Sequence, residues 1–447
     1  MVPAAYNALL EALRTGNPAA FEQIPLGSSR KLTDPQAGYA FDLEGADAFT
    51  FIQAPPPTFS SREIAAEIAE NYWMALLRDV PFTNYTSNAT AAAASADLTA
   101  FGADFKGPKN ANGHVTPELL FRGSTAGDKA GPLMSQFWYR PCNFGANVIN
   151  QKIRTVVPAT DYLTDFGSWR SIQNGGPAPT DVFDSELRYM RNGRDLGQWV
   201  HIDVLFQAYF QAFLIIAELG VPVDAGNPYK NSATQDGFGT FGGPHIATLL
   251  CEVSTRALKA VWNQKWLVHR RLRPEVFAAR VDRAAYHGAN YPVHQEILTS
   301  LNTNTRLGGY MTPGNAMLPQ AFPEGSPLHP SYGAGHATVA GACVTILKAW
   351  FDESFVIQEP VVPTNDGLGL LPYLGETLTV GGELNKIASN VANGRNMAGV
   401  HWRSDAAESL KLGEAVAISI LKDQRSCYNE IFNGFSLTKF DGTTTAV

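Results

Sequence analysis

The sequence predicts an all-α fold with long connecting loops. Apolar residues recur at helical spacing in most long segments, Gly- and Pro-rich stretches separate these segments, and extended segments are few. The chain has 447 residues, of which 45% are hydrophobic, and this is enough to bury a sizeable core. Because no internal repeat, charge block or low-complexity linker divides the chain, we expect a single domain over residues 1–447.

The first long helix is expected in "SSREIAAEIAENYWMALLRDV". Ser60 or Ser61 can cap its start, and apolar residues from Ile64 to Leu76 recur on one face at helical spacing.

A second helical stretch is expected from "TDVFDSELRYM" to "FLIIAELGVP". Thr180 and Asp181 are cap candidates at its start, and Gly220 with Pro222 just beyond is a typical helix end. We expect one long helix or a kinked pair. Further helices are predicted over residues 246–266, 337–351, 383–392 and 405–423. The best strand candidates are "ETLTV" and "FSLTKF", and long loops are expected over residues 158–180 and 222–243.

Composition argues against several classes of partner. Charged residues make up only 17% of the chain and the net charge is -7, so there is no basic footprint for nucleic acid. The N-terminus lacks a basic region followed by an apolar core, so no signal peptide is expected. The most apolar run, residues 204–219, contains Gln207 and Gln211 and is too short to span a bilayer comfortably. We predict a soluble protein and leave its compartment open.

Four cysteines lie far apart without a C-x-x-C pair, which argues against a zinc knuckle or a thioredoxin-type motif. They are Cys142, Cys251, Cys343 and Cys427. Cys251 and Cys343 fall in predicted helices, where a buried free thiol is the usual expectation. Disulfide pairing and redox compartment stay open.

Three segments in the C-terminal half carry cationic or hydrogen-bonding groups at close spacing. The first is "WNQKWLVHRRLRPE", in which Lys265 and Arg273 lie eight positions apart. This spacing is about two helical turns, so both side chains can reach one site. The alternative is a solvated basic face, because several charges follow one another here.

The second segment is "HPSYGAGHA". Gly333 and Gly335 let backbone N–H groups approach a ligand closely, and His336 stands at the start of a predicted helix, where free amides and the dipole favour an anion. The alternative is a Gly-rich turn with a capping histidine.

The third segment is "NGRNMAGVHWRSD". Arg395 precedes His401 by six positions, and Asp405 follows it by four, with Ser404 or Asp405 placed to cap the next helix. A lone histidine before a helix is usually structural, but the combination of these three residues is harder to explain in that way.

Together these segments indicate a pocket for a tetrahedral oxyanion. Lys265, Arg273 and Arg395 supply positive charge, and bidentate arginine geometry suits phosphate-like oxygens. His336 and His401 supply titratable nitrogens. No cluster of acidic residues accompanies them in the sequence, so magnesium or calcium chemistry is not expected.

The ordered patterns K-x7-RP, P-x-Y-x-x-GH and GR-x5-H-x3-D resemble those of the vanadium-dependent haloperoxidases. The segments "LEGADAFTFIQAPPPTFSSREIAAEIAENYWMALLRDVPFTNY" and "RYMRNGRD" resemble the algal and cyanobacterial bromoperoxidase branch. This resemblance implies two four-helix bundles, with the vanadate-binding motifs within residues 246–425. It also implies a large homo-oligomer, to which we expect residues 1–60 to contribute contacts as an N-terminal extension.

The resemblance implies vanadate as cofactor and a role for each motif residue. His401 would bond vanadium, while Lys265, Arg273, Arg395 and the Gly335 amide would hold its oxygens. His336, also at the cofactor, would be the acid–base group, a task that suits an imidazole with a pKa near 6.5.

The implied reaction is oxidation of bromide or iodide by hydrogen peroxide to hypohalous acid, which halogenates an organic acceptor. Lys265 would polarise one peroxide oxygen. His329 and Trp262 would line the halide side, the alternative being simple packing around the pocket. The halide preference and the acceptor are not specified by the sequence.

One residue departs from the resemblance. Ala334 stands where a serine usually donates a hydrogen bond to vanadate, and losing a hydrogen bond to a charged group costs about 1.5–3 kcal/mol unless water substitutes. Two carboxylates are candidates for orienting the site: Asp203 as partner of an active-site arginine, and Asp405 as partner of His401 or Arg395. Either could instead be a surface or capping residue.

The remaining histidines match no motif and are expected to be structural. They are His114, His201, His245, His269, His287 and His294.

The same oxyanion pocket occurs in acid phosphatases, which gives an alternative function. In that reading, His401 is the nucleophile and His336 the general acid. Phosphatases of this type lack the long N-terminal half seen here, so we favour the peroxidase. A third alternative, a storage or assembly protein with a vestigial site, predicts cations without competent histidines, but both histidines are present.

Overall fold

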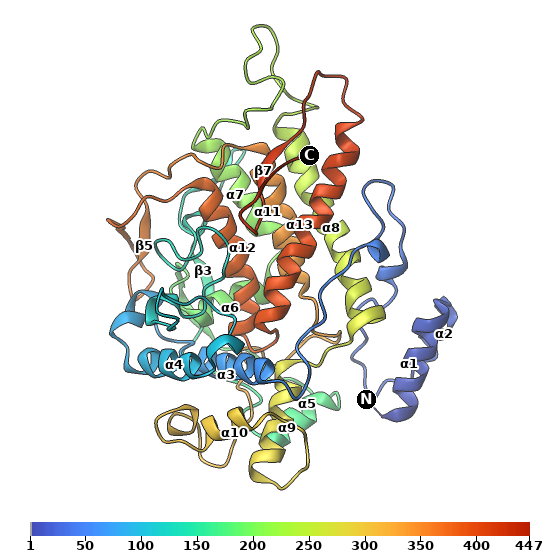
Figure 1. Ribbon diagram of the computed structural model, residues 1–447, viewed down its shortest axis with the longest axis vertical. Coiled ribbons are helices and arrows are strands. Elements are labelled where there is room, and N and C mark those ends of the chain that lie inside the picture. Colours follow the sequence, from blue (N-terminus) through green and yellow to red (C-terminus); the bar gives the residue numbers. More distant parts are fainter. Residues whose placement is uncertain (1) are drawn as a thin grey trace.

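The computed structural model describes residues 2–447, and it is mostly helical (Figure 1). The predicted all-α class is confirmed. The α-helices of the described chain are α1 Pro3–Thr15, α2 Pro18–Glu22, α3 Arg62–Leu76, α4 Ala89–Ala100, α5 Phe166–Gln173, α6 Gly193–Ile202, α7 Gln207–Glu218, α8 Gly243–Asn263, α9 Pro274–Tyr286, α10 Gln295–Leu301, α11 Gly335–Trp350, α12 Val380–Met397 and α13 Arg403–Arg425.

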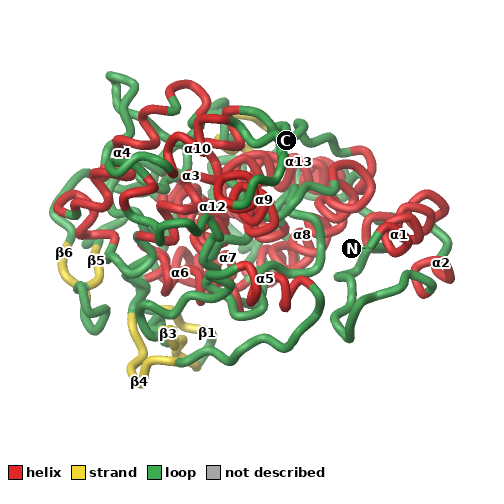
Figure 2. The backbone as a smooth tube through the Cα atoms, turned by 90° about the horizontal axis from the view of Figure 1, so that it is seen from below, coloured by secondary structure: helices red, strands yellow, loops and turns green. Residues whose placement is uncertain are grey.

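The strands are short and form four antiparallel pairs on the periphery, β1 with β2, β3 with β4, β5 with β6 and β7 with β8 (Figure 2). Their bounds are β1 Cys142–Phe144, β2 Asn147–Ile149, β3 Ile153–Val156, β4 Phe183–Arg188, β5 Val361–Pro363, β6 Leu370–Pro372, β7 Ser436–Thr438 and β8 Thr444–Ala446.

Helices α8, α11, α12 and α13 form a four-helix bundle, with α11 at its centre. Every residue of α11 except His336 is buried, as expected for a helix that is apolar all round. Gly341 and Gly413 allow α11 and α13 to approach closely: a Cβ at Gly341 would lie 2.1 Å from the Leu410 carbonyl oxygen, and one at Gly413 would lie 2.0 Å from that of Thr338.

The other helices cover this bundle. Helix α6 packs against α12, and α7 contacts α8, α11 and α12. Helices α3 and α4 lie across one end of the bundle, next to α9 and α10 (Figure 1). The three motifs lie where α8 ends, where α11 begins and where α12 is followed by α13.

The predicted helical stretch over residues 180–220 is partly wrong. Residues Phe183–Arg188 form strand β4 and pair with β3, so Thr180 and Asp181 cap no helix. The helix begins later because the Asn192 side chain accepts a hydrogen bond from the Asp195 amide. The expected kinked pair is confirmed from there on: α6 and α7 meet at 103°, and Gly220 follows α7 in the left-handed conformation.

Most other predicted elements are confirmed with shifted ends. Ser61 caps α3, and α8 begins three residues earlier than expected and continues into a π-helical turn, Gln264–His269. The segment "FSLTKF" contains β7. In contrast, "ETLTV" forms no strand, because Thr379 caps α12 and makes only an isolated bridge to Val356. The loop over residues 158–180 contains α5, which the sequence did not indicate.

Helices α1 and α2 lie beside the bundle and have a small core of their own (Figure 2). Leu9, Leu13 and Phe21 pack there against Trp266 of the π-helical turn. The N-terminal segment therefore contacts the part of the chain that carries the first motif.

The four cysteines are free thiols, with Cys142 and Cys343 buried, Cys251 partly buried and Cys427 exposed. Within residues 2–447, no single helix has the length and apolar character needed to cross a membrane, and only the bent pair α6–α7 meets these criteria jointly.

Candidate active site

The three motifs meet around a cavity of about 280 Å³ at the end of the four-helix bundle. Trp262 of α8, Gly335 and His336 of α11, Arg395 of α12 and His401 before α13 all line it. A larger cavity of about 570 Å³ between α3, α12 and α13 contains none of these five residues. The smaller cavity is therefore the candidate active site.

Lys265 projects from the π-helical turn and is completely buried. Its Nζ donates to the carbonyl oxygens of Pro330 at 2.7 Å and Ser331 at 3.0 Å, which are in the second motif. An ammonium has three N–H donors, so one remains for a ligand. Burial, and then the nearby Arg273 cation, lower the pKa of Lys265 well below its usual value.

Arg273 is buried at the start of α9, where all three of its guanidinium nitrogens are hydrogen-bonded. Nε donates to the His329 carbonyl at 3.1 Å, and Nη1 donates to the Val400 carbonyl at 2.7 Å. Nη1 also lies 3.0 Å from His401 Nε2, and Nη2 lies 2.9 Å from His329 Nδ1. Burial, and then Arg395, lower the pKa of Arg273 to about 9.

His401 is held in a defined orientation by partners on both ring nitrogens. Nδ1 lies 2.9 Å from Asp405 Oδ2, and Nε2 lies 3.0 Å from Arg273 Nη1. Since a carboxylate can only accept and a guanidinium can only donate, these contacts assign the proton to Nδ1 and a lone pair to Nε2. Burial, followed by the Arg273 cation, lowers the pKa of His401 well below 6.5.

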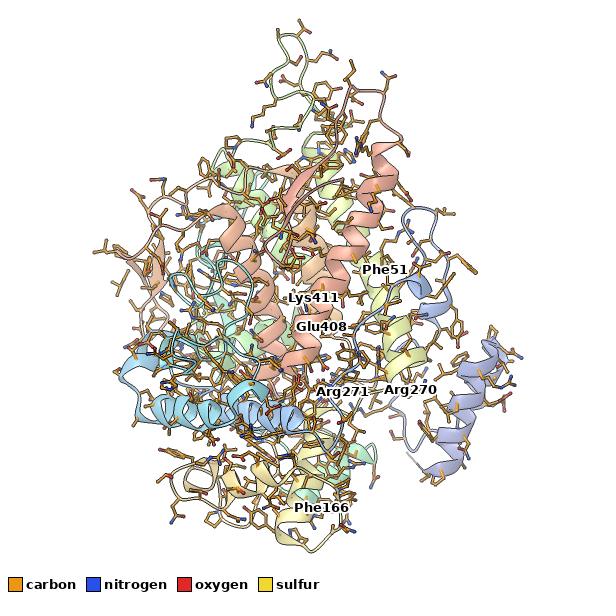
Figure 3. All side chains as sticks on the ribbon, in the orientation of Figure 1. Phe51, Phe166, Arg270, Arg271, Glu408 and Lys411 are labelled. Carbon is orange, nitrogen blue, oxygen red and sulfur yellow. The ribbon has the colours of Figure 1, made fainter. Side chains whose placement is uncertain are left out.

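Asp405 is itself fixed by a buried ion pair that the sequence did not indicate. Arg271 donates to Asp405 Oδ1 at 2.8 Å and to Glu67 Oε2 of α3 at 2.7 Å, and all three side chains are buried. Its neighbour Arg270, also labelled in Figure 3, instead donates to carbonyls within the π-helical turn. The expected alternative of a solvated basic face therefore does not hold for Arg271.

His336 is the partly exposed residue of α11, and it faces the cavity. Its Nε2 lies 2.9 Å from Asp203 Oδ1, at the junction of α6 and α7. Asp203 was expected to pair with an arginine, but it hydrogen-bonds His336 instead; the described residues offer no hydrogen-bond partner to its Oδ2. Burial lowers the pKa of His336, and Asp203 partly opposes this.

Arg395 lies in the last turn of α12 and lines the cavity. Its Nη1 donates to the Val200 carbonyl at 2.6 Å, and its guanidinium carbon lies 5.1 Å from the centroid of the Phe322 ring. Nε is buried and has no hydrogen-bond partner in residues 2–447. Burial lowers the pKa of Arg395 to about 10, although Asp203 and Glu324 oppose it.

The two residues expected on the halide side pack against each other. The ring centroids of Trp262 and His329 are 4.9 Å apart, and both side chains line the cavity. Trp262 Nε1 donates to the Thr33 carbonyl at 3.2 Å, so the N-terminal segment helps to place this wall. Burial, and then Lys265, lower the pKa of His329 well below 6.5.

Gly335 and Ala334 lie where α11 begins. A Cβ at Gly335 would come within 3.1 Å of Trp262 Cζ3, so a side chain here would be crowded by the indole. Ala334 is completely buried, and its amide donates to Ser409 Oγ at 2.8 Å. On the preceding loop, the Ser331 hydroxyl donates to Asp405 and lies 3.4 Å from His401 Nδ1.

Three further cavity residues were missed or assigned a structural role from the sequence. His201, Phe322 and Glu324 all line the cavity, and His201 Nε2 lies 2.7 Å from Glu324 Oε1. The sequence did contain an indication that two of them lie at the site, because His201 lies two positions before Asp203 and Glu324 lies five before His329.

Comparison with known proteins agrees with this geometry. The model of the VCPO second helical-bundle domain matches residues 249–430. The chain is 38% identical to the vanadium-dependent bromoperoxidase of Corallina officinalis, over 92% of this chain and 78% of that protein. It is 36% identical to the vanadium-dependent bromoperoxidase of Ascophyllum nodosum, over 99% and 84%.

A solved structure supports the same conclusion. The homohexameric second vanadate-dependent bromoperoxidase of Ascophyllum nodosum superimposes with a TM-score of 0.92 at 33% identity, covering 99% of this chain and 81% of that one. The helical fold, the arrangement of the three motifs and these relatives together show that the chain belongs to the vanadium-dependent bromoperoxidases.

Proposed function

We propose that this protein oxidises bromide or iodide with hydrogen peroxide, using vanadate, to a hypohalous acid that halogenates organic acceptors. The observation that carries the proposal is the state of His401. Its Nε2 lone pair accepts from Arg273, while Nδ1 is held by Asp405. An imidazole presented in this way beside an arginine is suited to bind the metal of an anionic group.

The residues around the cavity fit vanadate. Arg395 lines the cavity, and Lys265 and Arg273 lie behind lining residues, Lys265 near Trp262 and Arg273 in contact with His329 and His401. Three cations match an oxyanion with more than one negative charge, and Arg395 Nε is a buried donor without a partner among the described residues. His401 would hold the vanadium, and the Gly335 amide at the start of α11 would join the three cations at its oxygens. When bound, vanadate supplies a Lewis acid that activates peroxide.

His336 is suited to remove a proton from hydrogen peroxide. Its pKa is lowered, so the ring is mostly neutral at neutral pH, and Asp203 orients it through Nε2. The other ring nitrogen, Nδ1, is then available as the base.

Lys265 can polarise a peroxide oxygen through its remaining N–H, since its other two N–H groups are fixed on carbonyls. His329 and Trp262 would border the halide, and the Arg273 contact to His329 fixes that ring in place.

Addition of vanadate to the apo protein tests this function. Halogenation of a phenolic dye should require vanadate, peroxide and bromide together, and phosphate should suppress it by competing for the cations. A vanadate-loaded protein without halide-dependent halogenation would contradict the proposal. Turnover of a phosphate ester without halogenation would instead favour the acid phosphatase, with His401 as nucleophile.

We also propose that the chain acts as one domain and assembles into a homo-oligomer, with contacts from residues 1–60. Support comes from the homohexameric relative and from an exposed apolar loop. Phe41, Leu43, Phe49 and Ile52 are each at least 60% exposed on this loop. Replacing Leu43 and Ile52 by serine should lower the mass measured by light scattering, whereas Ile431→Ser, at a position 95% exposed elsewhere, should not.

A further inference from the structure

Two of the histidine–carboxylate pairs at the cavity include a residue from the C-terminal end of α6, and only one of these two has a role so far. Helix α6 brings His201 in its last turn and Asp203 just after it to the same wall. Asp203 holds His336, while His201 is held by Glu324 from the loop before the second motif. The second pair is therefore built into the wall of the same cavity as the proposed acid–base histidine.

The His201 ring has a fixed orientation. It stacks flat on Phe322, with centroids 3.9 Å apart and planes 8° apart, and its Nε2 lies 2.7 Å from Glu324 Oε1. This contact places the ring proton on Nε2 and leaves a lone pair on Nδ1. Nδ1 is buried and finds no hydrogen-bond partner in the described chain, so it is available to a small polar molecule in the cavity.

The proposed reaction gives such a group a task. Bromide, hydrogen peroxide and one proton yield hypobromous acid and water, so every turnover takes a proton from solvent. The cavity is bordered by Arg395, with Lys265 and Arg273 behind it, and these cations repel a free hydronium ion. A proton enters more easily on a side chain whose positive form is balanced by a carboxylate.

The charges around the His201–Glu324 pair allow a protonated side chain to be balanced by a carboxylate. The Glu324 side chain is 37% exposed and that of His201 is 18% exposed, so the carboxylate side of the pair faces solvent. Burial raises the pKa of Glu324, but the bond to His201 and the nearby Arg30 lower it below its usual value, which keeps it ionised. The other titratable side chains that line the cavity are His329, His336, Arg395 and His401, and Asp203 lies behind His336.

We propose that His201, held by Glu324, carries this proton between solvent and the cavity, an inference that rests on the proposed function. Neutral His201 takes up on Nδ1 a proton that a water molecule brings into the cavity from solvent, and becomes an imidazolium balanced by Glu324. It then gives the proton, directly or through one water, to the peroxide oxygen that leaves as water, and returns to the neutral form. The Nε2–H stays on Glu324 throughout.

Two substitutions test this role. His201→Phe retains a ring to stack on Phe322 but cannot carry a proton, and His201→Ala leaves space for a small base. With vanadate, peroxide and bromide saturating, both should lower kcat by on the order of 10²-fold, the lower range for loss of a general acid–base group. Added imidazole should restore activity to His201→Ala in a saturable manner, and should not restore it to His201→Phe. His287→Ala, at a histidine that lines no part of this cavity, is the matched control.

A measurement apart from turnover separates proton transfer from structural support. Vanadate affinity, determined by equilibrium dialysis, should stay within about twofold of wild type, because His201 does not contact the cationic groups. A kcat equal to wild type in both variants would overturn the inference. So would a loss that imidazole does not reverse and that is accompanied by weaker vanadate binding. Wild-type protein that binds vanadate but oxidises no halide would reject the proposed function itself.

Discussion

Two groups of residues at the cavity differ in how many hydrogen-bond partners their polar atoms have. We call Arg273 and His401 the inner wall, and Arg395, Asp203 and His201 the outer wall. On the inner wall, all three nitrogens of Arg273 and both ring nitrogens of His401 have protein partners. On the outer wall, Arg395 Nε, Asp203 Oδ2 and His201 Nδ1 are buried without partners in the described residues. The inner wall is thus fixed by the protein itself, and the outer wall keeps atoms available for solvent and reactants.

This difference indicates a division of work. Groups that must bind a charged cofactor gain from being oriented beforehand, because little reorganisation is then needed when the ligand arrives. Here the Arg273 contact must open to free the His401 Nε2 lone pair. Groups that exchange protons need a free lone pair and a path to water. Substitutions in the two walls should therefore have separate effects.

The largest effect is expected from the ion pair behind the inner wall. Arg271→Ala leaves the buried carboxylates of Asp405 and Glu67 without their cation, so unfolding free energy should fall by about 3–5 kcal/mol. Urea denaturation measures this. Arg14→Ala, which removes an exposed ion pair, should leave the midpoint unchanged. Equal stability of the two variants would show that Arg271 does not anchor the wall.

The second-largest effect is expected for Arg395, the cation of the outer wall. Arg395→Met removes a buried donor that has a free Nε, and loss of a hydrogen bond to a charged ligand costs about 1.5–3 kcal/mol, or roughly 10- to 150-fold in vanadate affinity. Equilibrium dialysis with the apo protein gives the dissociation constant. Arg270→Met, at a position outside the cavity, is the control. An unchanged affinity would mean that the outer wall does not take part in binding.

A smaller effect is expected in the pH profile. His336 acts as a base only when neutral, so kcat/KM for peroxide should fall as pH drops through its pKa, which lies below 6.5. Asp203 raises that pKa, and therefore Asp203→Asn should shift the acid limb to lower pH. A shift to higher pH would contradict the assignment of His336 as the base, and Asp441→Asn, on the surface, should cause none.

The smallest effect is expected at Ala334. Ala334→Ser adds a hydroxyl at the start of α11, and it should tighten vanadate binding by about tenfold at most, since a water molecule can already supply this bond. Ala334 is fully buried, so thermal unfolding must be compared as well. Weaker binding at unchanged stability would show that the alanine suits this pocket better than serine.

Sequence reasoning found the helical class and the residues of the three motifs, because both depend on local spacing. It failed where distant segments decide the outcome. Residues 183–188 pair with β3 and become a strand, and Arg271 is buried because Glu67, more than 200 positions away, meets it. The Asp203 partner was misjudged for the same reason, since the bend between α6 and α7 aims it at His336.

The π-helical turn at Gln264–His269 affects the directions in which the side chains that follow it point. Each residue of a regular helix advances the side-chain direction by about 100°. Removing one residue from this turn would convert it toward an ordinary helix and rotate the following stretch, including Arg271 and Arg273, relative to Lys265. A one-residue deletion among positions 266–269 should thus separate the cations of the first motif even though it removes none of them.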